Sequence, residues 1–130
     1  KVADMFKPTT VMIESNGFQR LVAHAARDVE RLPVRTHNTG NERNHSQIGV
    51  PGLAVQLEKG LYTIPFSPTA EEGSRPGTRD LVRGLSHLMW GLNGRIEGHI
   101  ADPVIALWMC ELAIHDYEKN HLSMATWDWL

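Results

Sequence analysis

Apolar and polar positions along the first forty residues predict a strand, a helix and a second strand. Residues 10–13 form a short apolar run rich in β-branched side chains, which is typical of a buried, parallel strand. Apolar residues then recur at helical spacing and predict a helix of about four turns that ends at Pro33; they are Phe18, Leu21, Val22, Ala25, Val29 and Leu32. Residues 34–37 have the composition of the next strand. This succession predicts a βαβ unit and hence an α/β fold.

The rest of the chain predicts further helices separated by loops. The expected elements are a helical segment at 1–7, a helix at 50–58, a strand at 61–66, a helix at 78–90 and a helix at 103–119. Pro51 suits a first helical turn, Gly60 suits a helix end, and the pair Asp102-Pro103 is a strong helix start. Loops are expected at 39–47 and 67–77. Residues 121–130 are expected to form a tail, made apolar by Trp127 and Trp129.

Composition places the chain among single-domain globular proteins. It has 130 residues, 42% of them hydrophobic and 22% charged, with a net charge of −2. Such a chain cannot hold DNA by bulk charge, so local arginines or metal ions would have to bridge the phosphates. No apolar run approaches the roughly 20 residues that a membrane span needs. The lone Cys110 excludes an intrachain disulfide, favours a reducing compartment and is expected to be a buried thiol.

Several catalytic motifs are missing from the sequence. It contains neither GxxxxGK[ST] nor GxGxxG, so nucleotide binding through a phosphate loop or a Rossmann turn is not supported. A GxSxG nucleophile elbow and an HExxH zinc motif are missing as well. The candidate catalytic and metal-binding residues are therefore carboxylates and single histidines.

Two carboxylates stand where a metal site of an α/β sheet is expected. Glu14 follows the first strand directly, and active sites form at the carboxyl ends of strands. Asp102 begins an apolar helix, and His99 lies three residues before it as a nitrogen ligand or proton carrier. Carboxylate oxygens suit Mg²⁺ or Mn²⁺. The alternatives are a solvent-facing or helix-capping Glu14, a plain N-cap at Asp102 and a surface histidine at His99.

Three segments, in this order, resemble the nuclease domain of the large subunit of tailed-phage terminases. They are KPTTVMIESNGFQRL at 7–21, the stretch from Gly49 through Leu53-Ala54-Val55 and Glu58-Lys59-Gly60 to Pro65, and ADPVIALW at 101–108. The last is similar to the D-x-V-M-A-L-W helix start of the family. Together the three segments cover most of the chain up to about residue 120.

The resemblance implies an RNase H-like nuclease fold, with a mixed sheet flanked by helices, and a metal-dependent DNA endonuclease. The family cuts concatemeric viral DNA by hydrolysis of the phosphodiester at two Mg²⁺ or Mn²⁺ ions. Glu14 would be the second acidic ligand and Asp102 the last, with His99 beside it. Residues 1–120 would form the nuclease domain and 121–130 a C-terminal tail. The implied location is the cytoplasm of the infected or lysogenic bacterial host.

The sequence departs from the family pattern at two places. The first acidic ligand of the family is an Asp on an earlier strand, which has no counterpart here, and Ala101 stands where many relatives carry an acid. The chain therefore resembles the carboxyl-terminal part of the domain, without its N-terminal strands. Within a whole subunit, the implied partners are double-stranded DNA, an ATPase motor domain, a small terminase subunit and the portal, and no membrane.

DNA contacts are expected from the loops at 39–47 and 67–79. The candidate residues are Asn16, Arg43, His45, Arg75 and Arg79, although a solvated polar loop is the alternative for Arg43 and His45. Two other functions remain open. One is an inactive RNase H-like docking module that uses the tail with Trp127 and Trp129. The other is a different RNase H-like nuclease, of the resolvase or exonuclease type.

Overall fold

The computed structural model describes residues 2–40, 42–45, 49–66 and 76–127, with the side chains of 3–121 within these ranges. The chain forms two compact units, one of residues 1–40 with 109–130 and the other of residues 41–108. Helix α5 (Asp102–Trp127) contributes its first turns to the second unit and the remainder to the first. We describe each unit by itself. The architecture is mixed α/β with small sheets, as the sequence predicts at this coarse level.

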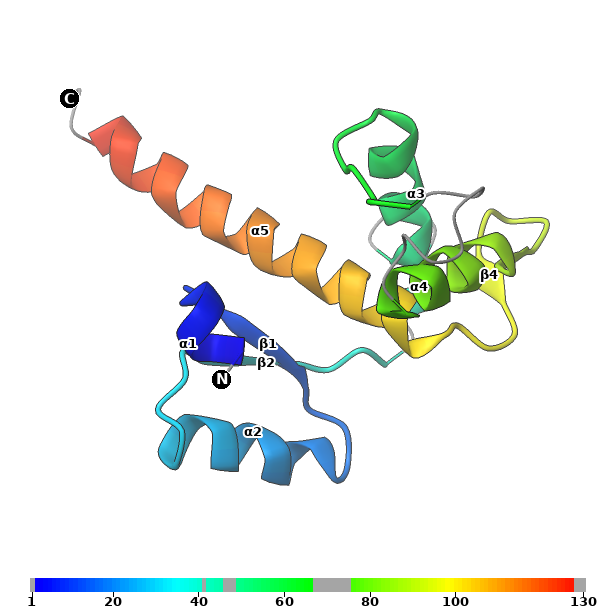
Figure 1. Ribbon diagram of the computed structural model, residues 1–130. Helices are drawn as coiled ribbons and strands as arrows, with labels where there is room; N and C mark the ends of the chain where they lie inside the picture. Colours follow the sequence, from blue (N-terminus) through cyan, green and yellow to red (C-terminus); the bar gives the residue numbers. More distant parts are fainter. Residues whose placement is uncertain (1, 41, 46–48, 67–75, 128–130) are drawn as a thin grey trace. The chain divides into compact units, whose positions relative to one another are not determined.

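The first unit contains the predicted βαβ motif. Strand β1 (Val11–Glu14) leads into helix α2 (Gln19–Asp28), and strand β2 (Val34–His37) returns parallel to β1 (Figure 1). In the register, Val11 lies opposite Val34 and Glu14 opposite His37. Pro33 contributes its carbonyl group, which accepts the amide of Val11 at 2.9 Å. The prediction of a parallel strand is therefore confirmed, although every residue of β1 is only half-buried.

Helix α2 turns its strongly apolar side away from the sheet, although an apolar stripe at helical spacing typically faces the core. Phe18, Leu21 and Val29 are 75%, 63% and 75% exposed, whereas Ala23 is buried. Arg20 and Arg27 lie on the sheet-facing side and donate to the backbone oxygens of Ser15 (3.0 Å) and Val34 (3.4 Å). These backbone acceptors and the small Ala23 determine which side of the helix meets the strands, so the periodicity found the helix but not its orientation.

Short helix α1 (Val2–Phe6) and the later turns of α5 complete the first unit. Arg35 Nη1 on β2 lies 3.6 Å from Asp116 Oδ2 on α5, in an exposed ion pair.

Cys110 is exposed on α5, so the prediction of a buried thiol is wrong. Along α5 as a whole, the buried apolar residues are Val104, Trp108 and Met109. The Sγ atom of Cys110 emerges on a different side and lines a shallow pocket with Thr10 and Tyr117.

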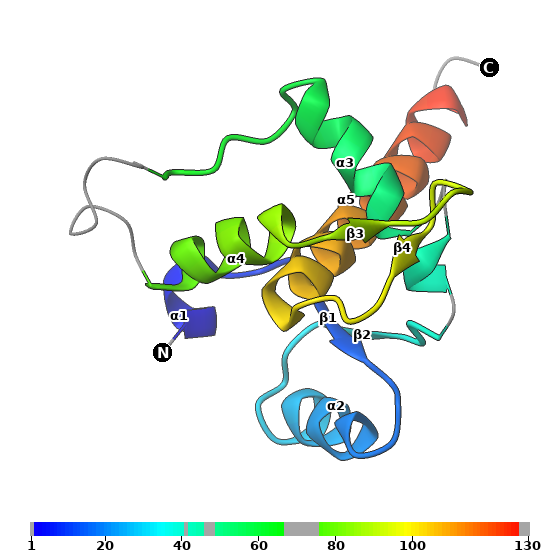
Figure 2. The ribbon, with the colours of Figure 1, turned by 90° about the vertical axis from the view of Figure 1, so that its right-hand side faces the viewer.

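The second unit is built on helices around a hairpin (Figure 2). A 3₁₀ turn, η1 (Glu42–Asn44), precedes helix α3 (Val50–Glu58), and helix α4 (Pro76–Ser86) precedes the antiparallel strands β3 (Met89–Trp90) and β4 (Ile96–Glu97). Its buried apolar residues come from α3, the hairpin and the start of α5; they are Val50, Leu53, Ile96, Ile100, Val104 and Trp108. Helix α3 has the predicted bounds, and Gly60 follows it with a φ of +71°.

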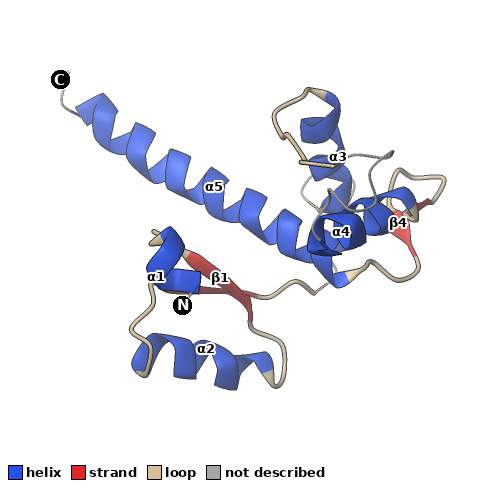
Figure 3. Ribbon diagram, viewed as in Figure 1, coloured by secondary structure: helices blue, strands red, loops and turns tan. Residues whose placement is uncertain are grey.

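Three predicted elements differ from the structure (Figure 3). The segment 61–66 is a loop, not a strand: Pro65 lacks a ladder donor, and no described strand pairs with the segment. The helix predicted at 78–90 ends at Ser86, because Met89 and Trp90 pair with β4. Helix α5 continues through the expected tail to Trp127, since residues 120–127 contain neither Pro nor Gly.

Two glycines permit close approaches inside the second unit. A Cβ atom at Gly49 would lie 2.4 Å from the carbonyl oxygens of Glu42 and Arg43, so only glycine fits between η1 and α3. A Cβ atom at Gly84 would lie 2.8 Å from Cγ2 of Val104, where α4 meets the first turn of α5. No helix among the described residues has the length and apolar character of a membrane-crossing segment.

Candidate functional site

The predicted ligand Glu14 lies at the carboxyl end of the parallel pair. It is the last residue of β1, opposite His37, the last residue of β2. The chain continues into the turn before α2, where the amide of Ser15 donates to the carbonyl oxygen of His37 at 2.8 Å. In α/β sheets, ligands bind in the crevice outside these strand ends. The structure therefore puts Glu14 at the end of the sheet where the sequence argument expects a site.

The carboxylate of Glu14 is held through one oxygen. Asn16 donates from Nδ2 to Glu14 Oε1 at 2.7 Å, and the hydroxyl group of Thr39 donates to the same oxygen. Asn16 Nδ2 also lies 3.1 Å from Thr39 Oγ1. The second oxygen, Oε2, accepts no hydrogen bond from the residues that the structure describes. A half-buried carboxylate whose Oε1 is engaged in this way retains its other oxygen as a ligand atom for a cation.

Sequence reasoning missed Thr39 as a hydrogen-bond partner of Glu14 and His37 as its neighbour across the sheet. His37 is the cross-strand neighbour of Glu14, so both side chains project from the same face of the sheet, and His37 is half-buried. Thr39 stands two residues after the end of β2, just as Asn16 stands two residues after the end of β1. The shared position of Asn16 and Thr39, two residues after each of the two predicted parallel strands, could have identified them as neighbours from the sequence.

Asp102 and His99 belong to the second unit. Asp102 is the first residue of α5 and is exposed, and the carbonyl oxygen of Ala101 accepts the amide of Ile105 at 3.2 Å. His99 is also exposed and follows Gly98, which has a φ of +78°. An acid in the first turn of a helix is stabilised by the amide groups there. Because Glu14 lies in the other unit, the convergence of the two acids stays a prediction.

The donor chemistry of both acids fits a divalent cation of the magnesium type. Their carboxylate oxygens are the ligands that Mg²⁺ and Mn²⁺ prefer, and such ions keep several waters when one or two carboxylates bind them. Within the described ranges, no group of three or more His, Cys, Asp or Glu residues could hold a metal ion.

The candidate DNA contacts are spread over both units. Asn16 is engaged with Glu14, whereas Arg43 and His45 are exposed at and after η1, and Arg79 is exposed on α4. Arg75 and positions 67–75 of the second predicted DNA loop lie outside the described residues.

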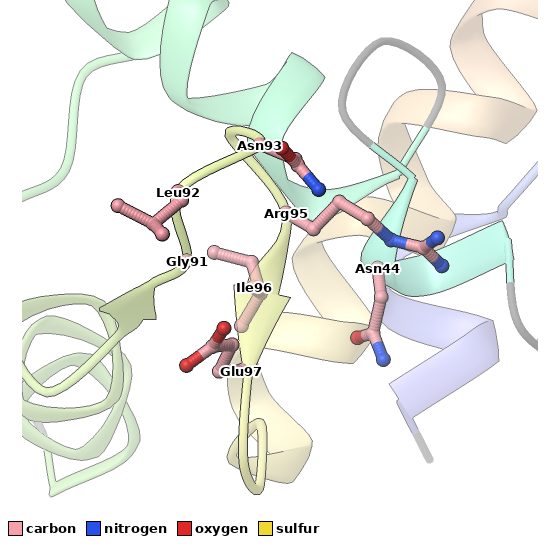
Figure 4. A pocket seen from close by; sticks show the side chains of 7 residues that line it. All are labelled: Asn44, Gly91, Leu92, Asn93, Arg95, Ile96 and Glu97. Carbon is pink, nitrogen blue, oxygen red and sulfur yellow. The ribbon is translucent and has the colours of Figure 1, made fainter.

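The hairpin and η1 enclose a pocket of about 340 Å³ in the second unit (Figure 4). Arg95 extends its guanidinium group toward Asn44, and Asn93 lines the same pocket from the hairpin turn. The polar side chains of the pocket are thus the guanidinium group of Arg95, the amides of Asn44 and Asn93, and the carboxylate of Glu97. Sequence reasoning did not single out Asn93 and Arg95, because Met89 and Trp90, which form the first strand of the hairpin, were included in a predicted helix.

Comparisons with models of protein families, with curated proteins and with solved structures give no match to this chain.

Proposed function

We propose that this chain is part of the nuclease domain of a phage terminase large subunit, with an RNase H-like fold, and that it acts in metal-dependent cleavage of double-stranded DNA. The supporting observation is the position of Glu14. It ends a strand of a parallel βαβ unit, and Asn16 and Thr39 hold its Oε1 at the carboxyl end of the sheet. The order of the three sequence segments that resemble the terminase family supports the same assignment.

In this proposal, Glu14 and Asp102 bind two Mg²⁺ or Mn²⁺ ions. When bound, these ions supply the activation of water and the stabilisation of the leaving oxygen in phosphodiester hydrolysis. The residues of the chain fix the ions and compensate their charge. His99 lies near Asp102 in sequence and carries a proton between the site and solvent.

The DNA backbone is held by side chains outside the acidic site. Arg43, His45 and Arg79 contact phosphates, which compensates for the net negative charge of the chain. The partners in the whole subunit are the ATPase motor domain, the small terminase subunit and the portal. The place of action is the cytoplasm of the bacterial host, where concatemeric viral DNA is packaged.

Cleavage of supercoiled plasmid by the full-length subunit tests this function. With Mn²⁺ present, the wild type should nick and linearise the plasmid, and EDTA should stop the reaction. Glu14→Gln should abolish cleavage, whereas Glu30→Gln, an exposed change in the same unit, should leave it intact. Equal cleavage by Glu14→Gln and wild type would remove Glu14 from the site. Degradation of linear DNA with no action on circles would indicate an exonuclease instead.

One observation favours a second function, that of a catalytically inactive docking module. The outer side of α2 exposes Phe18, Leu21, Val22 and Val29, which is a large apolar stripe for a helix surface. Under this alternative, Glu14→Gln leaves the activity of the assembled machine unchanged, whereas Leu21→Asp lowers the binding of a partner protein. The proposed contact through Trp127 and Trp129 lies outside the described side chains.

A further inference from the structure

Thr39 is buried at the carboxyl end of the parallel strands. It is 1% exposed, and it is the one buried polar residue among those whose burial the structure describes. A buried hydroxyl group is costly unless it is hydrogen-bonded. Here the hydroxyl donates to Glu14 Oε1 and accepts from Asn16 Nδ2. The position of Asn16 thus directs the proton of Thr39 toward the carboxylate.

Both donors act on the same oxygen of Glu14. Asn16 Nδ2 and Thr39 Oγ1 approach Oε1 from the segments after β1 and after β2, and they also contact each other. This triangle restricts rotation of the carboxylate and occupies the lone pairs of Oε1. A cation can then bind Glu14 through Oε2 alone, because a second bond to Oε1 would have to displace one of the two donors.

We propose that Asn16 and Thr39 are positioning residues that make Glu14 a monodentate ligand and thereby select small divalent cations. This inference rests on the proposed role of Glu14 in metal binding. Mg²⁺ and Mn²⁺ accept one oxygen per carboxylate in octahedral geometry, whereas the larger Ca²⁺ readily takes both oxygens of one carboxylate. Hydrogen bonds to a metal-binding carboxylate commonly determine its orientation and its affinity for the ion.

Thr39→Val tests the proposal, since it removes the hydroxyl group and keeps the shape of the side chain. Mn²⁺ and Ca²⁺ affinities of the chain are measured by isothermal titration calorimetry. The loss of the donor should weaken Mn²⁺ binding by about 10- to 100-fold. It should weaken Ca²⁺ binding less, because Oε1 becomes available, so the ratio of Mn²⁺ to Ca²⁺ affinity should fall. Thr39→Ser keeps the hydroxyl group and should retain the wild-type ratio.

The ratio of the two affinities separates positioning from a general structural role. A structural defect weakens both ions alike, so an unchanged ratio in Thr39→Val would overturn the proposal. Asn16→Ala provides a second variant should Thr39→Val fail to fold, and it should shift the ratio in the same direction. An unchanged ratio in a folded Asn16→Ala would also overturn it.

Glu14→Gln distinguishes this inference from the function on which it rests. When Glu14→Gln loses Mn²⁺ binding and Thr39→Val keeps both the affinity and the ratio of wild type, the positioning role is wrong and the metal role of Glu14 stands. When Glu14→Gln binds Mn²⁺ as tightly as wild type, the proposed function itself is wrong, and the positioning role fails with it.

Discussion

Thr39 donates its hydroxyl hydrogen bond to Oε1 of Glu14 and so joins the segments that follow two neighbouring parallel strands. The two residues are 25 positions apart, and the βαβ connection brings them together. This contact connects the βαβ unit with the candidate metal site, because it orients the carboxylate of Glu14 at the end of the sheet where ligands bind.

The orientation of α2 leads us to predict stability effects opposite to those that the hydrophobic periodicity alone would suggest. Leu21→Gln should change the free energy of unfolding by no more than about 0.5 kcal/mol, because the side chain is already exposed. Ala23→Met on the same helix should destabilise by about 1–3 kcal/mol, since it overfills a buried position against the strands. Urea denaturation of both variants measures these changes. A large loss for Leu21→Gln with none for Ala23→Met would show that the helix faces the other way.

The sequence predicts the βαβ unit well because its signals are local. The apolar run before Glu14, the helical spacing after Phe18 and the break at Pro33 each act over a few residues. The side of α2 that meets the strands depends instead on tertiary partners. Arg20 and Arg27 find backbone oxygens, and the small Ala23 permits a close approach, which a hydrophobic stripe does not reveal.

Helix α3 offers a matched test of the core of the second unit. Leu53 is 1% exposed and Val55, two residues later, is 46% exposed. Leu53→Ala should destabilise by about 2–5 kcal/mol through lost burial and a residual cavity. Val55→Ala should stay within about 0.5 kcal/mol. Thermal or urea unfolding gives both values, and equal effects would contradict the burial of Leu53.

Replacement of either of the two glycines of helix α4 by alanine should change the stability, in opposite directions. Gly77→Ala should stabilise by about 0.5–1 kcal/mol, since nothing lies within 4 Å of the added Cβ and alanine favours the helix. Gly84→Ala should destabilise, because its Cβ would meet Cγ2 of Val104 at 2.8 Å and Cβ of Ala101 at 3.1 Å. Melting temperatures of the two variants provide the comparison. A stabilised Gly84→Ala would contradict the close contact of α4 with the first turn of α5.

The candidate site is only partly readable from the sequence. Glu14 is recognisable as a candidate, because it stands at the carboxyl end of an apolar strand, where ligands bind in α/β sheets. Thr39 is not, since its burial arises from the folded chain and threonine is common in loops. The hairpin residue Arg95 is missed for another reason: Met89 and Trp90 continue the helical pattern of the preceding segment, so the sequence does not indicate that they pair with β4 as the first strand of a hairpin.

The central claim is that Glu14 and Asp102 bind the same divalent cation cluster, and Mn²⁺ titration of the chain tests it most directly. Glu14→Gln and Asp102→Asn should each weaken Mn²⁺ binding by more than the about 10- to 100-fold effect of an outer-sphere partner. The double variant should lose little beyond either single change, because ligands of one site act together. Asp80→Asn, an exposed change on α4, is the control and should bind as the wild type does. Full Mn²⁺ affinity in Asp102→Asn, or strictly additive losses in the double variant, would contradict the claim.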